Sequence, residues 1–209
     1  MSDTGSVGTN AVRRYEVLIE TGDCYAALGD ADAARDCYRE AITLAPARGK
    51  PHVGLGVLAL QRGRIDAALA AFNRARRAEP TCGEAYGGLA MAYQQQGAYA
   101  EAFDMYLTCL ELDADNLTAL LGLFQTSCQM GTFAKVIHFL QVYLDRHPCD
   151  TSVLFCLASL YVKEDRLDDA RTALRRVLAL QPHKTEAAEL LADVDRRIAA
   201  CGTAGVLNR

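Results

Sequence analysis

The sequence has 209 residues, and several features that would assign it to a familiar class are missing. It has no tryptophan and no run of about 18 uninterrupted apolar residues, so we predict no transmembrane helix and no membrane insertion. The N-terminal segment lacks the apolar stretch of a secretory signal, which favours a cytoplasmic location. The net charge is only −4, without long runs of one sign. We expect no nucleic acid partner, because phosphate binding needs a basic surface.

Motifs that carry catalysis or bind metals are also missing. No P-loop, GxSxG or HExxH motif occurs, and none of the eight cysteines forms a CxxC pair. The segment from His147 to Cys149 is only a weak metal-ligand signal. Most cysteines fall within helical patterns, where cysteine acts as a small hydrophobe. We therefore predict that the protein is not an enzyme and has no cofactor or metal.

The sequence does contain a period of 34 residues, which is the spacing from Pro46 to Pro80. Prolines after helical runs, a glycine series and a series of small residues all keep this period, which indicates tandem helix-turn-helix units. The three series are Pro46, Pro80, Pro148 and Pro182; Gly29, Gly63, Gly97 and Gly131, with Asp165 in fifth place; and Ala34, Ala68, Ala102, Val136 and Ala170.

The period divides the chain into five repeats, within which we number positions 1 to 34. A further first helix over 185–201 has no second helix after it. Its polar far side suits the end of an array, where no neighbour covers it. Disordered tails are expected over 1–11 and 202–209, with the array spanning 12–184. The repeats are 15–48, 49–82, 83–116, 117–150 and 151–184.

Each recurring position has a physical role. Position 8 is usually small because paired helices cross there, and position 24 is large because it fills the space between successive repeats. Position 15 ends the first helix in a left-handed conformation, which favours glycine. Position 32 ends the second helix, since proline blocks its continuation. The recurring positions of repeat 2 hold Leu55, Gly56, Ala68, Phe72, Ala75 and Pro80.

This pattern resembles the tetratricopeptide-repeat family over about residues 15 to 184. The family's tryptophan is absent, and residues that mostly supply bulk stand in its place. The resemblance implies an all-α, right-handed α-solenoid of five repeats with a C-terminal capping helix, serving protein interaction rather than catalysis. The residues in place of tryptophan are Leu18, His52, Tyr86, Leu120 and Leu154.

The resemblance also implies that the first helices line a concave groove, which positions 2, 5, 9, 12 and 13 face. These positions are mostly apolar here, with amides among them, and exposed apolar side chains along a groove are typical of a binding surface. We therefore predict an adaptor that binds an apolar peptide or helix of another protein. The candidate residues are Ile19, Asp23, Val53, Val57, Leu60, Met91, Gln94, Leu121, Gln125, Phe155, Ser159 and Val162.

Several alternatives stay open. A shift of the register by one residue would place these side chains between helices, and the N-terminal tail could fill the groove. The chain could instead be a self-assembling homo-oligomeric scaffold, or a secretion-type chaperone for apolar segments. An enzyme would have only Cys128 and Cys156 near the groove as reactive thiols.

Two departures from the family pattern narrow the prediction. Family members that hold a C-terminal carboxylate of a chaperone need basic and asparagine side chains, but here those positions hold residues such as Val53, Val57 and Thr118. We therefore exclude that partner. Repeat 4 has Phe124 and Tyr143 where small residues are usual, and we expect a wider gap between its helices, with repacking favoured.

Glycines also recur at position 6, where each costs about 1 kcal/mol relative to alanine in a helix interior. Their common register predicts close approach of another group, either a ligand or a neighbouring helix. Tight helix packing explains them at least as well as a ligand does. The three glycines are Gly54, Gly88 and Gly122.

Overall fold

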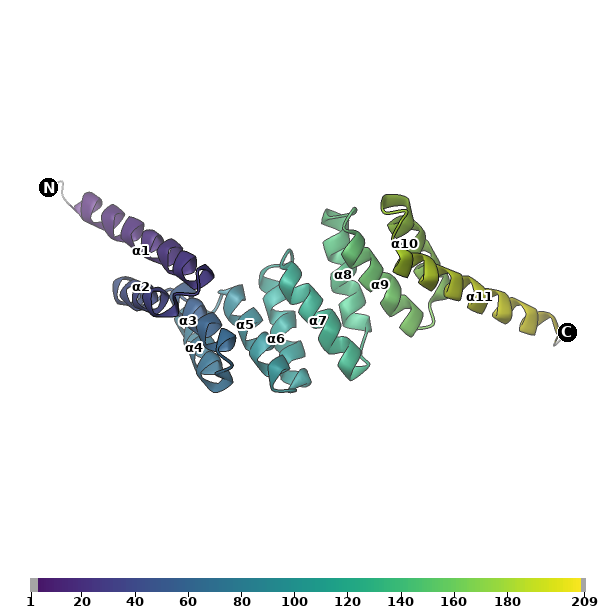
Figure 1. The fold of residues 1–209 in the computed structure, drawn as a ribbon, viewed down its shortest axis with the longest axis horizontal. Helices are drawn as coiled ribbons and strands as arrows, with labels where there is room; N and C mark the ends of the chain where they lie inside the picture. The colour runs from purple at the N-terminus through teal and green to yellow at the C-terminus, as the bar shows by residue number, and fades with distance from the viewer. Residues whose placement is uncertain (1–3, 208–209) are drawn as a thin grey trace. The chain divides into compact units, whose positions relative to one another are not determined.

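The computed structural model describes the backbone of residues 4–207 and the side chains of residues 10–200. Over that backbone all regular secondary structure is α-helical, in eleven helices (Figure 1). The helices are α1 (Thr4–Ala27), α2 (Ala31–Leu44), α3 (Lys50–Gln61), α4 (Ile65–Ala78), α5 (Gly83–Gln95), α6 (Tyr99–Leu112), α7 (Leu117–Met130), α8 (Ala134–Arg146), α9 (Thr151–Lys163), α10 (Leu167–Leu180) and α11 (Thr185–Leu207).

The chain divides into two compact units, Met1–Gly122 and Leu123–Arg209, with the boundary inside α7. In the first unit, α1 packs against α2 and α3, while α5 packs against α3, α4 and α6. In the second unit, α9 packs between α8 and α10, and α10 also contacts α11. The helices α3, α5, α9 and α11 are therefore each covered on one side by the helix that precedes them. None of the helices in residues 4–207 is both long enough and apolar enough to cross a membrane.

The turns inside the helix pairs match the prediction for position 15. Five residues there have positive φ, the left-handed conformation in which glycine has no steric penalty. The prediction of left-handed residues at these positions is confirmed, including the single non-glycine. They are Gly29 (83°), Gly63 (68°), Gly97 (77°), Gly131 (70°) and Asp165 (57°).

The ends of the chain differ from the expectation of disordered tails. Helix α1 begins at Thr4, and α11 starts at Thr185 as expected but extends to Leu207. No proline interrupts either segment, so the helical hydrogen bonding continues beyond the parts that pack on neighbours. Residues 1–3 and 208–209 lie outside the described residues.

The position 6 glycines lie against aromatic rings of the preceding second helix. A Cβ on Gly54 would lie 2.4 Å from the Tyr38 ring, and one on Gly88 would lie 2.3 Å from the Phe72 ring. The position 8 glycine of each ring's own repeat lies against the same ring. A Cβ on Gly22 would lie 2.7 Å from the Tyr38 ring, and one on Gly56 would lie 2.5 Å from the Phe72 ring. Each ring is thus held between two glycines. Neighbouring helices explain the glycine series without a ligand.

Candidate functional site

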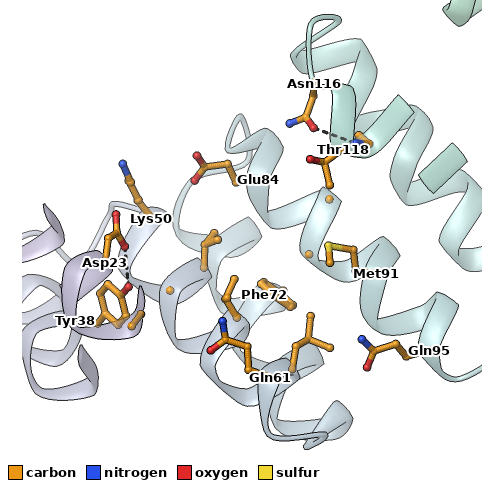
Figure 2. Close-up of a pocket in the computed structure, with 18 of the residues that line it drawn as sticks. Asp23, Tyr38, Lys50, Gln61, Phe72, Glu84, Met91, Gln95, Asn116 and Thr118 are labelled. Carbon is orange, nitrogen blue, oxygen red and sulfur yellow. Dashed lines mark hydrogen bonds between the residues drawn. The ribbon is translucent and has the colours of Figure 1, made fainter. Parts of the chain in front are cut away.

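A groove of about 760 Å³ lies within the first unit, Met1–Gly122. Its lining comes from α1, α3 and α5, the second helices beneath them, and the start of α7. Figure 2 shows part of this lining in close-up. We call it the unit 1 groove. It is lined by Asp23, Ala26, Ala27, Tyr38, Lys50, Val53, Gly54, Val57, Leu60, Gln61, Phe72, Glu84, Gly87, Gly88, Met91, Gln95, Tyr106, Asn116, Thr118 and Ala119.

Glycines form part of the floor of the groove. Gly54 and Gly88 carry no side chain, and the buried rings of Tyr38 and Phe72 lie directly against them. The rings fill the space that side chains at these two positions would take. The glycine packing that holds successive repeats together therefore also shapes the groove.

Two apolar side chains stand exposed on this floor. Val57 from α3 is 40% exposed and Met91 from α5 is 39% exposed, whereas the other apolar side chains of these helices are buried or partly buried. They occupy position 9 of successive repeats. Together with the glycines they form an apolar strip along the groove.

Polar side chains border the strip on both sides (Figure 2). Lys50, Glu84 and Thr118 lie along one edge, and Gln61 and Gln95 lie along the opposite edge. Lys50 and Glu84 are exposed and have opposite charges. The groove therefore has an apolar centre, an edge of mixed charge and an amide edge.

Two phenols are fixed by hydrogen bonds at the groove. The Tyr38 hydroxyl donates to Asp23 Oδ1 at 2.7 Å, and the Tyr106 hydroxyl donates to Gln94 Oε1 at 2.7 Å. Burial raises the pKa of Tyr106 to about 12. It also raises the pKa of Tyr38, with a further contribution from the hydrogen bond to Asp23. Both phenols therefore remain neutral donors at physiological pH.

The structure brings five of the predicted binding residues together in the unit 1 groove, and these residues are Asp23, Val53, Val57, Leu60 and Met91. Ile19 lies elsewhere: it is 3% exposed in a core cluster with Tyr38 and Leu58. Because α3 packs across α1 at this point, Ile19 has almost no surface for a ligand. Gln94 holds the Tyr106 hydroxyl, and Leu121 is partly buried outside the groove lining.

The remaining predicted residues belong to the second unit. Phe155 is partly buried, with the Lys184 Nζ 5.0 Å from its ring centroid. The Ser159 hydroxyl donates to the Phe155 carbonyl at 2.9 Å, and Val162 is also partly buried. Gln125 is exposed. These residues do not line the unit 1 groove.

The sequence-based list omitted the floor of the groove. Gly54, Gly87 and Gly88 line it, as do the buried rings below, and Lys50 and Glu84 form one edge. The in-register glycines were the available signal, but spacing alone did not tell a ligand from a neighbouring ring. Lys50 and Glu84 stand at position 2, which the resemblance had placed facing the groove.

Thiols whose pKa is raised by burial are poorly suited to act as nucleophiles. Burial raises the pKa of Cys156 to about 11, and that of buried Cys109 to about 11. Such thiols stay protonated at neutral pH, whereas the thiolate is the nucleophile. Among the described side chains, no three His, Cys, Asp or Glu residues cluster as metal ligands.

Known proteins share this architecture. Two solved structures agree in fold: PilF of Pseudomonas aeruginosa (18% identity, TM-score 0.71, 94% of this chain and 90% of that chain) and YrrB, described as a TPR protein with an unusual peptide-binding site (15%, 0.64, 82% and 89%). Human tetratricopeptide repeat protein 7A is 31% identical over 102 residues, which are 49% of this chain but only 12% of that protein.

Family models described as tetratricopeptide repeat match residues 15–48, 53–116 and 157–194. The matched segments overlap every helix that contributes to the unit 1 groove up to α6, while residues 117–156 fall between them. Agreement of the helix pairs, the left-handed turns, the fold and these segments leads to one conclusion. The chain belongs to the tetratricopeptide-repeat family, whose members are scaffolds for protein interaction.

Proposed function

We propose that the protein is a non-catalytic adaptor that binds an apolar segment of another protein in the unit 1 groove. The observation that carries this proposal is the exposure of Val57 and Met91, at 40% and 39%, above a floor of glycines. Apolar side chains grouped in a concave surface are favourable binding sites because a ligand removes them from water.

The groove offers both contact area and adaptability. Burial of apolar surface contributes roughly 25 cal/mol per Å² before the costs of association, so the exposed side chains on this strip contribute favourably to binding. Met91 has an unbranched, polarizable side chain that adjusts to different partners.

The polar edges restrict what the partner looks like. An apolar residue on the strip would be flanked by groups facing Lys50 and Glu84 on one side and the amides of Gln61 and Gln95 on the other. Primary amides donate to and accept from peptide groups, so they suit an extended main chain or polar helix flanks. We infer a partner segment with apolar residues at its centre and polar residues on both sides.

The comparison with YrrB supports the proposal in a limited way. Its description attributes a peptide-binding site to that protein, which has the same fold at 15% identity. The same architecture thus accommodates a peptide elsewhere. That the ligand is apolar is inferred from the groove of this chain and not from the comparison.

A peptide array with apolar, amphipathic and charged segments tests the proposal, followed by fluorescence anisotropy with the best binder. Met91→Glu places a carboxylate on the apolar strip, and we expect binding to weaken by about 100-fold, since burying an unpaired charge is costly. The matched control is Leu112→Glu, because Leu112 is 42% exposed on α6 outside the groove lining. Binding that survives both Met91→Glu and Val57→Glu would place the site elsewhere.

A further inference from the structure

Repeat 3 differs from the other four repeats because all of its charged residues have the same sign. Residues 83–116 contain six aspartates and glutamates but no lysine or arginine. All six acidic side chains are exposed. Repeat 3 therefore presents an acidic surface that no basic side chain of its own offsets. The six residues are Glu84, Glu101, Asp104, Glu111, Asp113 and Asp115.

The fold brings the two ends of this repeat together beside the unit 1 groove. Glu84 lies in the first turn of α5 and lines the groove. Asp113 directly follows α6, and its Cβ would lie 3.9 Å from a Cβ placed on Gly83, the residue before Glu84. Asp115 belongs to the same turn, where its backbone N–H donates to Asp113 Oδ1 at 3.1 Å. We call Glu84, Asp113 and Asp115 the acidic corner.

Two carboxylates of this corner remain available to a bound cation. Neither Glu84 nor Asp113 makes an ion pair with another described side chain. The Glu79 carboxylate at the end of α4, by contrast, lies 4.0 Å from the Arg48 guanidinium. The corner therefore keeps its negative charge at the border of the groove.

The other charged residues of the lining indicate where along the edge a cation would lie. Lys50 is exposed in the first turn of α3, and Figure 2 shows Glu84 between Lys50 and Thr118 along the edge. Asp23 also lines the groove, but its Oδ1 already accepts the Tyr38 hydroxyl at 2.7 Å. A cation is therefore most favourably placed beside the acidic corner, toward α7 and away from Lys50.

The corner and the apolar strip are close enough for one short segment to contact both. Glu84 and Met91 lie on the same side of α5, because residues at i and i+7 are two helical turns apart. Both line the groove. Seven residues of helix rise by about 10 Å, which an extended segment spans with about three residues.

We propose that the segment held in the unit 1 groove is basic as well as apolar, with a lysine or arginine beside the acidic corner and apolar side chains on the strip. This inference rests on the proposed function of the groove and specifies the chemistry of its partner. Charges attract or repel effectively within about 8 Å at physiological ionic strength. The corner therefore favours a basic partner and disfavours an acidic one.

Three peptides that share one apolar core and differ at a single position test the proposal. The position stands about three residues from the core and holds lysine, glutamine or glutamate. In fluorescence anisotropy at about 0.1 M salt, we expect the lysine peptide to bind most tightly and the glutamate peptide about 10-fold more weakly. In about 1 M salt, where charges act over only about 3 Å, the three affinities should converge while binding of the glutamine peptide persists.

A pair of matched variants locates the preference. Glu84→Lys should reverse the order of the lysine and glutamate peptides. The control is Glu101→Lys, which changes the charge of the same repeat equally, also in the first turn of a helix, but outside the groove lining. That variant should keep the order.

The possible failures differ from one another. Equal affinity for all three peptides, with binding still sensitive to Met91→Glu, would overturn this proposal and leave the proposed function intact. An order that Glu101→Lys changes as much as Glu84→Lys would also overturn it, because the overall charge would then cause the preference. Absence of binding by every apolar peptide would count against the proposed function itself.

Discussion

The two units solve the same packing problem with different side chains. In the first unit, position 24 is aromatic and the facing position 6 of the next repeat is glycine, as in Phe72 and Gly88. In the second unit, position 24 is leucine and the next position 6 is larger. The first-unit pairs are Tyr38 and Gly54, Phe72 and Gly88, and Tyr106 and Gly122; the second-unit pairs are Leu140 and Cys156, and Leu174 and Leu190.

The difference shows how one backbone period tolerates an exchange of volume. A bulkier ring on the second helix is matched by a missing side chain on the first helix that follows, and a smaller leucine by a larger neighbour. The exchange also has a consequence for function. Only the first unit gains a glycine floor, and it is there that the groove of about 760 Å³ lies.

The largest expected effect comes from filling a first-unit glycine. Gly88→Ala would place a Cβ 2.3 Å from the Phe72 ring, which is fully buried and also held by Gly56 from the other side. We expect the free energy of unfolding to fall by about 2 kcal/mol, because overpacking exceeds the usual helical gain of alanine over glycine. Denaturant unfolding measured by circular dichroism provides the test.

The adjacent residue is the matched control for this variant. A Cβ on Gly87 would meet its nearest neighbour, the Cys109 Sγ, at 3.4 Å, which is an ordinary contact. Gly87→Ala should therefore leave stability unchanged or raise it by up to about 1 kcal/mol. Adding Phe72→Leu to Gly88→Ala should restore part of the loss, since it copies the second unit. Equal effects of Gly87→Ala and Gly88→Ala would refute the packing account.

In the second unit, introducing a glycine at position 6 should lower stability, whereas in the first unit replacing one should. Cys156→Gly removes a partly buried side chain from the interior of α9, where leucine rather than an aromatic ring stands at the facing position. We expect a loss of about 1 to 2 kcal/mol from helix propensity and the space left behind. Hydrogen exchange of α9 peptides measures this locally, and Leu140→Phe added to Cys156→Gly should recover part of the protection.

The phenol hydroxyls contribute less than the rings. Tyr38→Phe removes the hydrogen bond to Asp23, and Tyr106→Phe removes the one to Gln94. Each loss should cost about 1 kcal/mol or less, with Tyr38→Phe at the lower end because Asp23 is solvent-exposed. Phe72, which has no hydroxyl in the native chain, shows that the ring alone packs well. Thermal melting of the two variants at neutral pH checks the expected order.

Much of the fold followed from the period, because caps and helix ends depend on local conformation. The left-handed residues were predicted individually, even Asp165, since the turn requires positive φ at a fixed position. The groove was predicted less completely. Spacing shows which side of a helix a residue occupies, but Ile19 is buried because a neighbouring helix crosses it. That contact depends on the angle between helices, which no local pattern specifies.

The helix ends and the glycine floor show the same limit. Residues from Thr4 onward have no strong helix signal, yet the helix continues because nothing breaks it. Gly54 and Gly88 signalled close approach, but only the structure distinguishes a ring from a ligand. Sequence periodicity thus predicts local conformation well. It indicates long-range neighbours only where a bulky neighbour requires a small residue at a recurring position.

The smallest expected effect is a pH dependence of stability that comes from the first unit. His52 occupies position 4 of repeat 2, where the second unit has Leu154. Burial lowers the pKa of His52, nearby Arg74 lowers it further, and the buried Nδ1 has no hydrogen-bond partner. The folded state therefore binds a proton less readily than the unfolded state, whose pKa is about 6.5.

The sign of the pH dependence follows from that difference. Well above the unfolded-state pKa of about 6.5, both states hold His52 neutral, so its contribution to stability is fully present. As pH falls through this value, protonation favours the unfolded state and stability is lost. His52→Tyr, which copies Tyr86 of the next repeat, should flatten the melting temperature between pH 7.5 and pH 5 relative to the unchanged protein. His138→Tyr on an exposed site of α8 is the control and should leave the slope as it was. If the slope of melting temperature against pH were unaffected by His52→Tyr, other groups would cause the acid sensitivity. Hydrogen exchange would then show whether those groups act in the first unit.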